Sequence, residues 1–428
     1  MSKVKELVKK SLGYVQRRIA SRNVTKFQKR TRKRVQRKEA LSIVFLIQFP
    51  EMWNSYKTIY EHFSALGNEV SLYILAVPKR VSVENGYGTF CERNEAFDFF
   101  KKNGISAIDA YGNGSWFPIK NLTPDYIFVQ RPYEAHMPKE YSLYRLSKAG
   151  TVCYVPYGGR MTKGIHLSLE FNHALLNNAY MIFADCTDSY NYILNNPGVK
   201  KRKVFDIGYP RFDLIESPDR KIEKPVQTFL WTPRWAYDQV TGYGHFLDYF
   251  ECLMLYFETH KDFRLIIRPH PLMFPNFIQK GLLSNEEYQG IQKRVTEAIN
   301  VSFDENADYL ITFKESDALI SDGSSLLLEY FVTGKPILCC MSCFEDPTEI
   351  TQRLQECFYT ISNADQLMEA IVHITENDDY RVEQRIALIK KIKHGSFQIG
   401  RAIVKEILED ATAEKIMEAY DYERSKGD

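Results

Sequence analysis

From Leu41 onward, short apolar runs alternate with longer stretches in which apolar residues recur at helical spacing. The clearest runs are LSIVFLIQF (41–49) and VSLYILAV (70–77), and the segment 55–66 between them has a helical pattern. Apolar runs of this length are typical of parallel strands that are covered on both faces. The pattern therefore predicts βαβ units around a parallel sheet. Further strands of this kind are predicted at 105–111, 125–130, 151–156, 179–184 and 203–208.

The stretch 215–226 interrupts this pattern, because it is polar, contains two prolines and has no periodicity. We therefore place an inter-domain linker at 216–227, after a first Rossmann-like domain at 41–215. The alternation then restarts, with a helix at 246–259, and predicts a second α/β domain at 228–395. Residues 380–420 have a helical pattern throughout, so 396–428 is predicted as a C-terminal helix that can cross back. The strands predicted in the second domain are 228–232, 263–269, 301–304, 317–322 and 335–340.

A strong charge asymmetry separates the first 40 residues from the rest. Residues 1–40 contain 15 Lys or Arg against Glu6 and Glu39, a net charge of +13, so the remainder carries −11 of the chain's total of +2. The segment is predicted to be a basic amphipathic arm, since apolar residues recur in it at helical spacing. These residues are Val4, Leu7, Val8, Leu12, Val15 and Ile19.

Three roles fit such an arm. It can lie on an anionic membrane surface, where each basic residue contributes about 1 kcal/mol, it can bind nucleic acid, or it can cover its own domain. We expect the membrane surface, because the body is acidic and shows no helix-turn-helix or zinc signature. The chain has no run of 18 or more apolar residues, and the arm lacks the features of a secretory signal.

The eight cysteines include no CxxC pair and no histidine partner at zinc-finger spacing. We therefore expect reduced thiols in a reducing, cytoplasmic compartment. The patterns GxxxxGK[ST], GxGxxG, HExxH and GxSxG do not occur, and no metal or cofactor is expected.

Polar residues that suit chemistry lie where predicted strands end, which is the edge at which open α/β sheets bind ligands. In ISDGSSLLLEYFVTGKPIL (320–338) a strand ends at Asp322, Gly323 permits a tight turn, and Ser324 and Ser325 open a helix. The serines can simply cap this helix. Alternatively, the turn presents N–H groups and hydroxyls to an anion at the positive end of the helix. Glu329, one turn further on, can accept from a ribose hydroxyl.

Two other clusters follow strands of the second domain. RLIIRPHP (264–271) presents Arg268 and His270 between prolines that fix the backbone. A purely structural role is the alternative for this single histidine. WTPRW (231–235) presents Arg234 in the same way.

The predicted first domain contributes two more. GYPRFD (208–213) offers Arg211 and Asp213. YVPYGGRMTKG (154–164) is a glycine-rich turn with Arg160 and Lys163, and two histidines, 166 and 173, follow it.

Together, IRPHP, SDGSSLLLEYFVTGKPIL, GYPRFD and WTPRW resemble, in order and spacing, the motifs of the CDP-glycerol glycerophosphotransferases. This is the family of teichoic acid and capsule primases and polymerases, and the resemblance runs from about Tyr180 to Phe358. It implies a GT-B architecture, with two Rossmann-like domains that face a central cleft and a nucleotide donor held by the second. It also implies action at the membrane on a lipid-linked acceptor, which agrees with the basic arm.

The resemblance also assigns roles. His270 corresponds to the catalytic or phosphate-facing histidine, Ser324 and Ser325 to serines at the donor phosphates, and Glu329 to an acidic residue that faces the ribose. The donor-binding set is completed by Arg234, Arg268, Asp322 and Gly323. Near the cleft we expect Arg211, Asp213, Arg160 and Lys163.

The predicted first domain departs from the family at one position. Where the family has a Trp-His-Gly motif whose histidine serves as general base, this sequence reads Pro156-Tyr157-Gly158. A tyrosine with a pKa near 10 is a poor base at pH 7. The alternatives are another base (His166, His173 or Glu134), a donor other than CDP-glycerol, or a base-independent transfer. Tyr157 and His166 thus join His270 as candidate catalytic residues.

The sequence therefore predicts a transferase that moves glycerol phosphate, or another polyol phosphate, from a CDP-activated donor to a hydroxyl of a cell-surface polymer, with release of CMP. The expected partners are the CDP-polyol donor, a lipid-linked or oligosaccharide acceptor, and an anionic membrane surface through residues 1–40, at the inner face of the cell membrane. No nucleic acid partner is expected. The alternatives are a GT-B glycosyltransferase with a nucleotide-sugar donor and a membrane-attached scaffold without chemistry.

Overall fold

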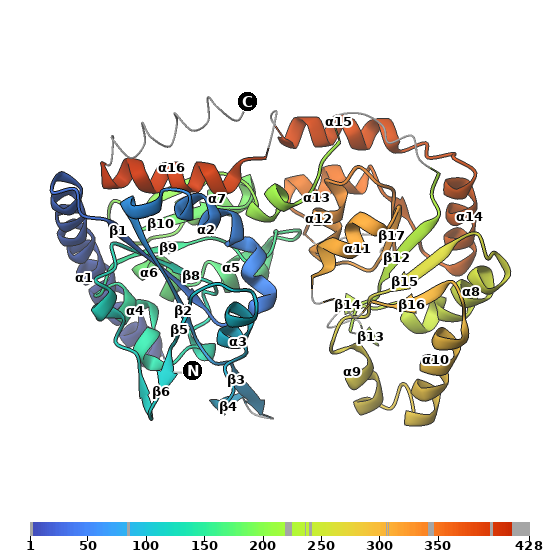
Figure 1. Ribbon diagram of the computed structural model, residues 1–428, viewed down its shortest axis with the longest axis horizontal. Coiled ribbons are helices and arrows are strands. Elements are labelled where there is room, and N and C mark those ends of the chain that lie inside the picture. Colours follow the sequence, from blue (N-terminus) through green and yellow to red (C-terminus); the bar gives the residue numbers. More distant parts are fainter. Residues whose placement is uncertain are drawn as a thin grey trace. The chain divides into compact units, whose positions relative to one another are not determined.

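The chain folds into two compact units, one made of residues 1–214 and 398–428 and the other of residues 215–397 (Figure 1). The computed structural model describes residues 3–83, 86–218, 225–235, 237–238, 242–304, 306, 308–340, 346–393 and 397–412. Much of the predicted linker, residues 219–224, lies outside the described residues.

The first unit is built on a seven-stranded sheet in the order β11-β10-β9-β8-β1-β2-β5, and every pair in it is parallel. The apolar runs became its strands, since all seven residues of β1 are buried. The prediction at 105–111 was too long, because only two of those residues pair with β2. The strands are β1 (Leu41–Ile47), β2 (Val70–Ala76), β5 (Ile108–Asp109), β8 (Tyr126–Val129), β9 (Thr151–Tyr154), β10 (Met181–Ala184) and β11 (Lys203–Asp206).

Helices connect and cover these strands (Figure 1). They are α2 (Lys57–Ser64), α3 (Glu95–Lys102), α4 (Leu143–Leu146), α5 (Gly164–Glu170), α6 (His173–Asn178) and α7 (Thr187–Asn195). Two hairpins that the apolar pattern did not predict are β3 (Arg80–Val83) with β4 (Gly86–Phe90), and β6 (Tyr111–Gly112) with β7 (Ser115–Trp116).

The basic arm is a helix, α1 (Lys3–Gln36), and its second half packs on the first unit. Ala20, Val24, Phe27 and Thr31 are buried at a spacing of three or four residues. The hydroxyl of Thr31 donates to Asp125 at 2.8 Å, and the Arg34 guanidinium pairs with the same carboxylate at 3.1 Å. This half of the arm therefore covers its own domain, which was one of the three roles considered for the arm.

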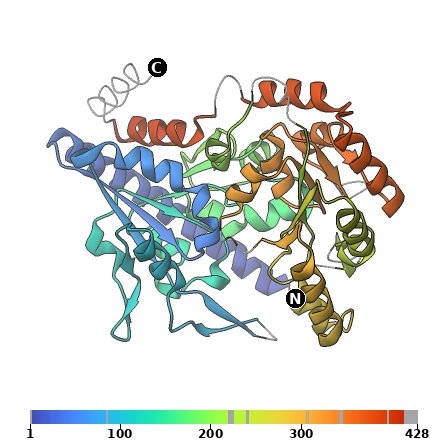
Figure 2. The same ribbon diagram turned by 45° about the vertical axis from the view of Figure 1, so that its right-hand side comes forward.

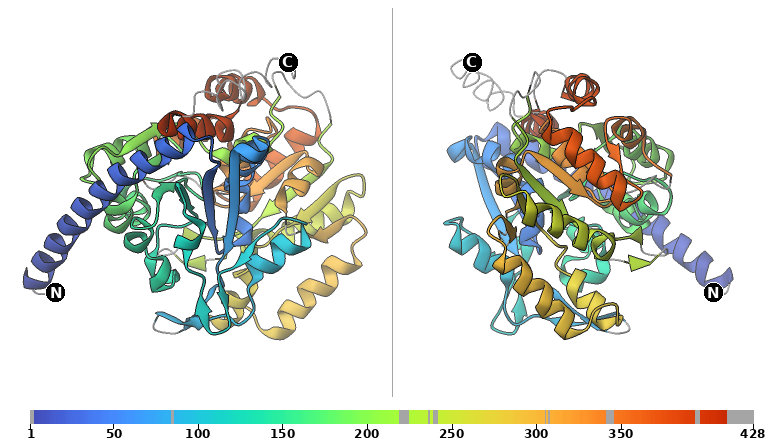
Figure 3. Two further views of the ribbon diagram at one scale, coloured as in Figure 1. Left: turned by 60° about the vertical axis from the view of Figure 1, so that its left-hand side comes forward. Right: turned by 90° about the vertical axis from the view of Figure 1, so that its right-hand side faces the viewer.

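The first half of α1 differs from the second. Leu12, Tyr14 and Val15 are all at least half exposed, and Figure 3 shows the first turns of the helix projecting beyond the rest of the unit. Among the described residues, no helix is both long enough and apolar enough to span a bilayer.

Residues 380–420 are not one helix, which corrects the prediction. α15 (Val382–Lys393) belongs to the second unit, whereas α16 (Ile399–Ala411) belongs to the first and lies beside α2 and α1 (Figure 2). α16 starts where it does because Asp213 accepts the N–H groups of Ile399 at 2.9 Å and Gly400 at 2.7 Å.

The second unit has a six-stranded parallel sheet in the order β16-β15-β12-β17-β18-β19. Its strands are β12 (Thr228–Thr232), β15 (Arg264–Ile267), β16 (Val301–Phe303), β17 (Ala318–Ser321), β18 (Ile337–Cys339) and β19 (Tyr359–Thr360). Its other helices are α8 (Phe246–Thr259), α9 (Met273–Gln279), α10 (Asn285–Glu297), α11 (Tyr309–Glu315), α12 (Leu326–Phe331), α13 (Glu349–Gln355) and α14 (Ala364–Thr375). A short hairpin joins β13 (Tyr237–Asp238) and β14 (Gly242–Tyr243).

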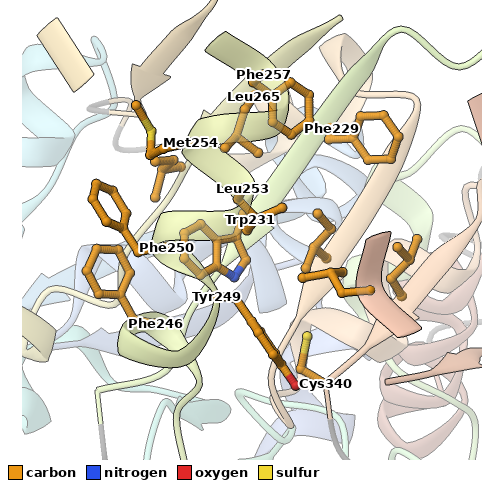
Figure 4. Packing of buried hydrophobic residues seen from close by; sticks show 14 of the residues in the cluster. Phe229, Trp231, Phe246, Tyr249, Phe250, Leu253, Met254, Phe257, Leu265 and Cys340 are labelled. Atoms are coloured by element: carbon orange, nitrogen blue, oxygen red, sulfur yellow. The ribbon is translucent and has the colours of Figure 1, made fainter. Parts of the chain in front are cut away.

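The helix predicted at 246–259 is confirmed as α8, and its apolar face packs on this sheet. Figure 4 shows its aromatic side chains gathered around Trp231 of β12. The rings of Trp231 and Phe246 stack with their centroids 5.1 Å apart, and both residues are fully buried. This contact fixes the start of α8 against the end of β12.

We expect Asp213→Ala to destabilise the first unit, because it removes both side-chain acceptors at the start of α16. The loss of such a cap is typically about 1–2 kcal/mol of unfolding free energy. Urea unfolding followed by circular dichroism measures it. The matched control is Asp206→Ala, which removes an exposed carboxylate of the same unit that accepts from the hydroxyl of Thr187 and caps no helix start among the described residues. Equal midpoints for the two variants would contradict the capping role.

Candidate functional site

The order of strands in the second unit changes direction between β12 and β17. From β12 the sheet grows through β15 and β16 on one side and through β17, β18 and β19 on the other. Open α/β sheets bind ligands at the carboxyl ends of the strands at such a point. WTPRW and SDGSS follow these two neighbouring strands, so the structure brings the predicted Arg234, Asp322, Gly323 and Ser324 to one edge.

Asp322 is the hub of this edge. Its carboxylate is 1% exposed. It accepts the backbone N–H of Arg234 at 2.7 Å and that of His245 at 3.3 Å, and it lies 2.7 Å from Nδ1 of His245. A buried carboxylate needs such donors to offset its desolvation. Asp322 therefore positions two neighbouring residues, and its role as a direct donor contact stays a prediction.

His245 was missed in the sequence. It precedes α8, and its ring stacks on Tyr249 with centroids 5.4 Å apart. Burial lowers the pKa of His245. The hydrogen bond to Asp322 and the negative charge of Asp322 together raise it by more, so the net shift is upward. No motif surrounds this histidine, and its only signal was its place directly before an amphipathic helix.

Ser324 and Ser325 lie at the turn after β17. Neither hydroxyl caps α12, so the capping alternative does not describe them: Ser325 makes no side-chain cap, and the buried Oγ of Ser324 has no hydrogen-bond partner among the described residues. The guanidinium of Arg234 donates to the carbonyl of Gly323 at 3.3 Å and so lies over this turn. A buried hydroxyl without a partner, next to a cation, suits an anionic ligand.

His270 follows β15, and its residue is exposed to solvent on one side while protein surrounds the ring on the other. Its backbone N–H donates to the carbonyl of Pro233 at 3.2 Å, which ties the end of β15 to the end of β12. The N–H of Leu272 donates to Nδ1 at 3.2 Å, so the ring proton is on Nε2. Loss of solvent around the ring and the charge of Arg234 lower the pKa of His270. At neutral pH this histidine is therefore a neutral hydrogen-bond donor.

Arg268 and Glu329 have protein partners. The Arg268 guanidinium pairs with Asp304 at 2.6 Å, and Glu329 is completely buried and accepts from the hydroxyl of Tyr309. Their predicted contacts with the donor phosphate and ribose stay predictions.

In the first unit, Tyr157 and Arg160 lie in the loop after β9. The hydroxyl of Tyr157 lies 3.2 Å from that of Tyr133. The Arg160 guanidinium pairs with Glu170 at 2.5 Å, and its backbone N–H donates to Asp185 at 2.5 Å. Burial raises the pKa of Glu170, and the charge of Arg160 opposes the shift. Arg160 thus anchors the loop that carries Tyr157.

The other candidates of the first unit are more dispersed. His166 is exposed on α5, His173 is exposed at the start of α6, and Lys163 lies 4.0 Å from Asp188. Glu134 accepts the N–H of Leu143 at 3.0 Å, at the start of α4. The general base is not identified by these contacts.

Arg211 and Asp213, the residues of GYPRFD, make structural contacts. Arg211 is 7% exposed and donates to the hydroxyl of Ser55 at 2.9 Å and to the carbonyl of Glu51 at 3.3 Å. Asp213 caps α16. The motif holds the end of the first sheet, the segment after β1 and the returning helix together, and its predicted place near a cleft stays a prediction.

These two sheets, with their helices and loops, make the fold one of the GT-B type, as the solved structures it resembles also indicate. A UDP-GlcNAc 2-epimerase from Neisseria meningitidis bound to UDP-GlcNAc aligns with a TM-score of 0.57 at 15% identity, over 86% of this chain and 100% of that one. A variant of the wall teichoic acid polymerase TagF soaked with CDPG aligns with a TM-score of 0.51 at 13% identity, over 94% and 99%.

The chain belongs to the CDP-glycerol:poly(glycerophosphate) glycerophosphotransferase family, whose model matches residues 170–403. It is also 27% identical over 235 residues to the teichoic acid ribitol-phosphate polymerase TarK of Staphylococcus aureus (strain NCTC 8325 / PS 47). That match covers 49% of this chain and 41% of the relative, so the chain spans about two fifths of the curated protein it matches.

The pair of His245 and Asp322 predicts a pH dependence of stability. The pKa of His245 is raised in the folded state. The pair's contribution to the free energy of unfolding is therefore complete below the unfolded pKa of about 6.5, and it is lost as the pH rises through the folded pKa. We expect Asp322→Asn to lower the His245 pKa, as seen by NMR titration of its imidazole, and to remove this contribution. Asp262→Asn, an exposed carboxylate of the same unit, is the control. An unchanged titration in Asp322→Asn would refute the pairing.

Proposed function

We propose that this protein transfers a polyol phosphate, such as glycerol phosphate, from a CDP-activated donor to a hydroxyl of a teichoic acid or capsule polymer, and releases CMP. The observation that carries the proposal is the buried Ser324 hydroxyl at the strand-order reversal of the second unit, which lies beside Arg234 and has no hydrogen-bond partner among the described residues. Family membership supports the CDP-linked donor.

In this proposal the donor pyrophosphate lies over the turn Gly323–Ser325. The Ser324 hydroxyl and the Arg234 guanidinium contact its oxygens. The acceptor oxygen attacks the β-phosphorus, the bond from that phosphorus to the bridging oxygen breaks, and CMP leaves with the electron pair. The proton of the acceptor hydroxyl passes to a base.

Two histidines serve different needs in this scheme. Neutral His270 donates from Nε2 to a phosphoryl oxygen on which charge develops, and such fixed donors typically supply a large part of catalysis. His245, held by Asp322, lies near the same edge, and its raised pKa favours the positively charged form. Stabilisation of the leaving CMP is the step that this charge suits.

We expect His270→Ala to lower CMP release by about 100-fold or more, the usual loss for one oxyanion donor. Released CMP is measured with CDP-glycerol and CDP-ribitol, and released UDP with UDP-sugars. His260→Ala is the control, because His260 is an exposed histidine of the same unit. Activity within about tenfold of wild type would exclude the role of His270. UDP release from a sugar donor, with no CMP from either CDP-polyol, would support the glycosyltransferase alternative instead.

We also propose that the first half of α1 holds the protein at an anionic membrane surface. Leu12 is 56% and Val15 50% exposed, and they lie three residues apart on a helix rich in Lys and Arg. An exposed apolar stripe flanked by basic residues suits the lipid interface. A basic groove on the same helix adds to the attraction for anionic headgroups. It is lined by Arg22, Thr25, Lys26, Lys29, Arg30 and Lys33.

The double variant Leu12→Glu/Val15→Glu should reduce co-sedimentation with anionic phospholipid vesicles about tenfold or more, since each buried apolar side chain contributes on the order of 1.5–3 kcal/mol. It leaves the packed half of α1 intact. Leu194→Glu changes an equally exposed leucine on α7 and serves as control. Vesicle binding that survives the double variant, or that is equal for neutral vesicles, would contradict the proposal.

A further inference from the structure

The first unit has its own reversal of strand order, between β1 and β8. From β1 the sheet grows through β2 and β5 on one side and through β8, β9, β10 and β11 on the other. Phe49 follows β1 and Arg131 follows β8, so both lie at the carboxyl edge where this kind of sheet binds ligands.

The backbone at this edge is tightly held. The side-chain oxygen of Gln130 accepts the N–H groups of Gln48 at 3.0 Å and Phe49 at 2.8 Å, and its amide donates back to the carbonyl of Phe49 at 2.7 Å. The amide of Gln48 donates to the carbonyls of Pro78 at 3.0 Å and His136 at 2.9 Å. Both glutamines are 3% exposed. The loops after β1, β2 and β8 are therefore fixed in position before any ligand binds.

Arg131 is held among three aromatic rings. Its guanidinium carbon lies 4.5 Å from the ring centroid of Phe49, 5.0 Å from that of Tyr133 and 5.7 Å from that of Tyr157. Stacking of this kind holds the planar group and leaves its N–H groups for an anion.

The charge of Arg131 acts on the carboxylate of Glu170, but that carboxylate forms its ion pair with Arg160. The Arg131 guanidinium makes no hydrogen bond or ion pair with any described residue, and its Nε is buried. Two other arginines of the same unit do have such partners, since Arg160 pairs with Glu170 and Arg211 donates to Ser55. A partly buried cation without an anion is costly, and this cost is understandable where a ligand supplies the anion.

The pKa of the neighbouring His136 is also affected by this positive charge. Burial, together with the charges of Arg131 and Arg80, lowers the pKa of His136 to about 4. Its ring lies 6.3 Å from that of Phe49 and 6.2 Å from that of Tyr133. His136 is therefore neutral at pH 7 and does not compete with Arg131 for an anion.

We propose that Arg131, on its platform of Phe49, Tyr133 and Tyr157, binds a phosphate group of the acceptor chain. The guanidinium fork matches two phosphate oxygens, and the rings offer apolar surface to the carbon atoms of the adjoining polyol. This assignment rests on the proposed function, and it specifies that the acceptor is recognised through a phosphate near the hydroxyl that reacts.

The test is direct binding, which does not depend on turnover. Isothermal titration calorimetry compares a short oligo(glycerol phosphate) with a neutral oligoglycerol of equal length. Arg131→Gln should weaken the binding of the phosphate oligomer about tenfold or more and leave the binding of the neutral oligomer unchanged. Arg131→Lys should recover only part of the loss, because a point charge lacks the planar fork. Arg93→Gln is the matched control, since it removes a cation of the same unit that is 80% exposed and pairs with Asp98.

Thermal unfolding separates this role from a structural one. A ligand-binding arginine without an ion-pair partner should change the melting temperature of Arg131→Gln only slightly, because the lost ring contacts are offset by removal of an uncompensated charge. A melting temperature lowered by more than about 5 °C, equally weakened binding of both oligomers, or unchanged binding would each overturn the assignment. Arg131-dependent binding in a wild-type protein that releases no CMP from any CDP-polyol would support this site while the proposed reaction fails.

Discussion

Buried carboxylates organise the strand ends on which both candidate sites depend. A buried carboxylate needs hydrogen-bond donors to offset its desolvation, so each one holds a nearby loop through the donors of that loop. Asp322 does this in the second unit, where it holds the backbone of Arg234 and the whole of His245. Glu170 and Asp185 do it in the first unit, where they hold Arg160 and with it the loop of Tyr157. These carboxylates thus fix the positions of the candidate ligand-binding groups.

The two sheets share a topology but differ in how they treat positive charge. At the reversal in the second unit, Arg234 and His245 are tied to Asp322 and Gly323. At the reversal in the first unit, the guanidinium of Arg131 lies against aromatic rings and forms no ion pair with a described residue. The family match begins at residue 170, so this second arrangement lies in the part of the chain that the match does not cover.

The fold was largely predictable from the apolar pattern, because a strand buried on both faces leaves an unmistakable run such as 41–49. The prediction failed where strand pairing alone sets the length of a strand, as in β5, and where a distant residue fixes the start of a helix, as Asp213 does for α16. In the site, SDGSS and WTPRW were predictable because polar residues directly follow strands. His245 and Arg131 were not, since each is a single residue without a motif, and only the order of strands brings it to the carboxyl edge of its sheet. Arg211 and Asp213 show the converse, in that a recognisable motif proved to make structural contacts.

The helix α1 is continuous from Lys3 to Gln36, and its second half is locked to the first sheet through Thr31, Arg34 and Asp125. Because the helix is unbroken, its exposed turns and its packed turns keep a fixed position relative to each other. At 1.5 Å per residue, Leu12 stands only about 28 Å along the axis from Thr31. Any surface that captures the exposed turns therefore also sets the tilt of the first sheet and the height of its carboxyl edge. The distance of the first sheet from that surface and its orientation are therefore set together. Inserting a single residue into the helix would rotate the carboxyl edge by about 100° relative to the face of α1 that binds the surface.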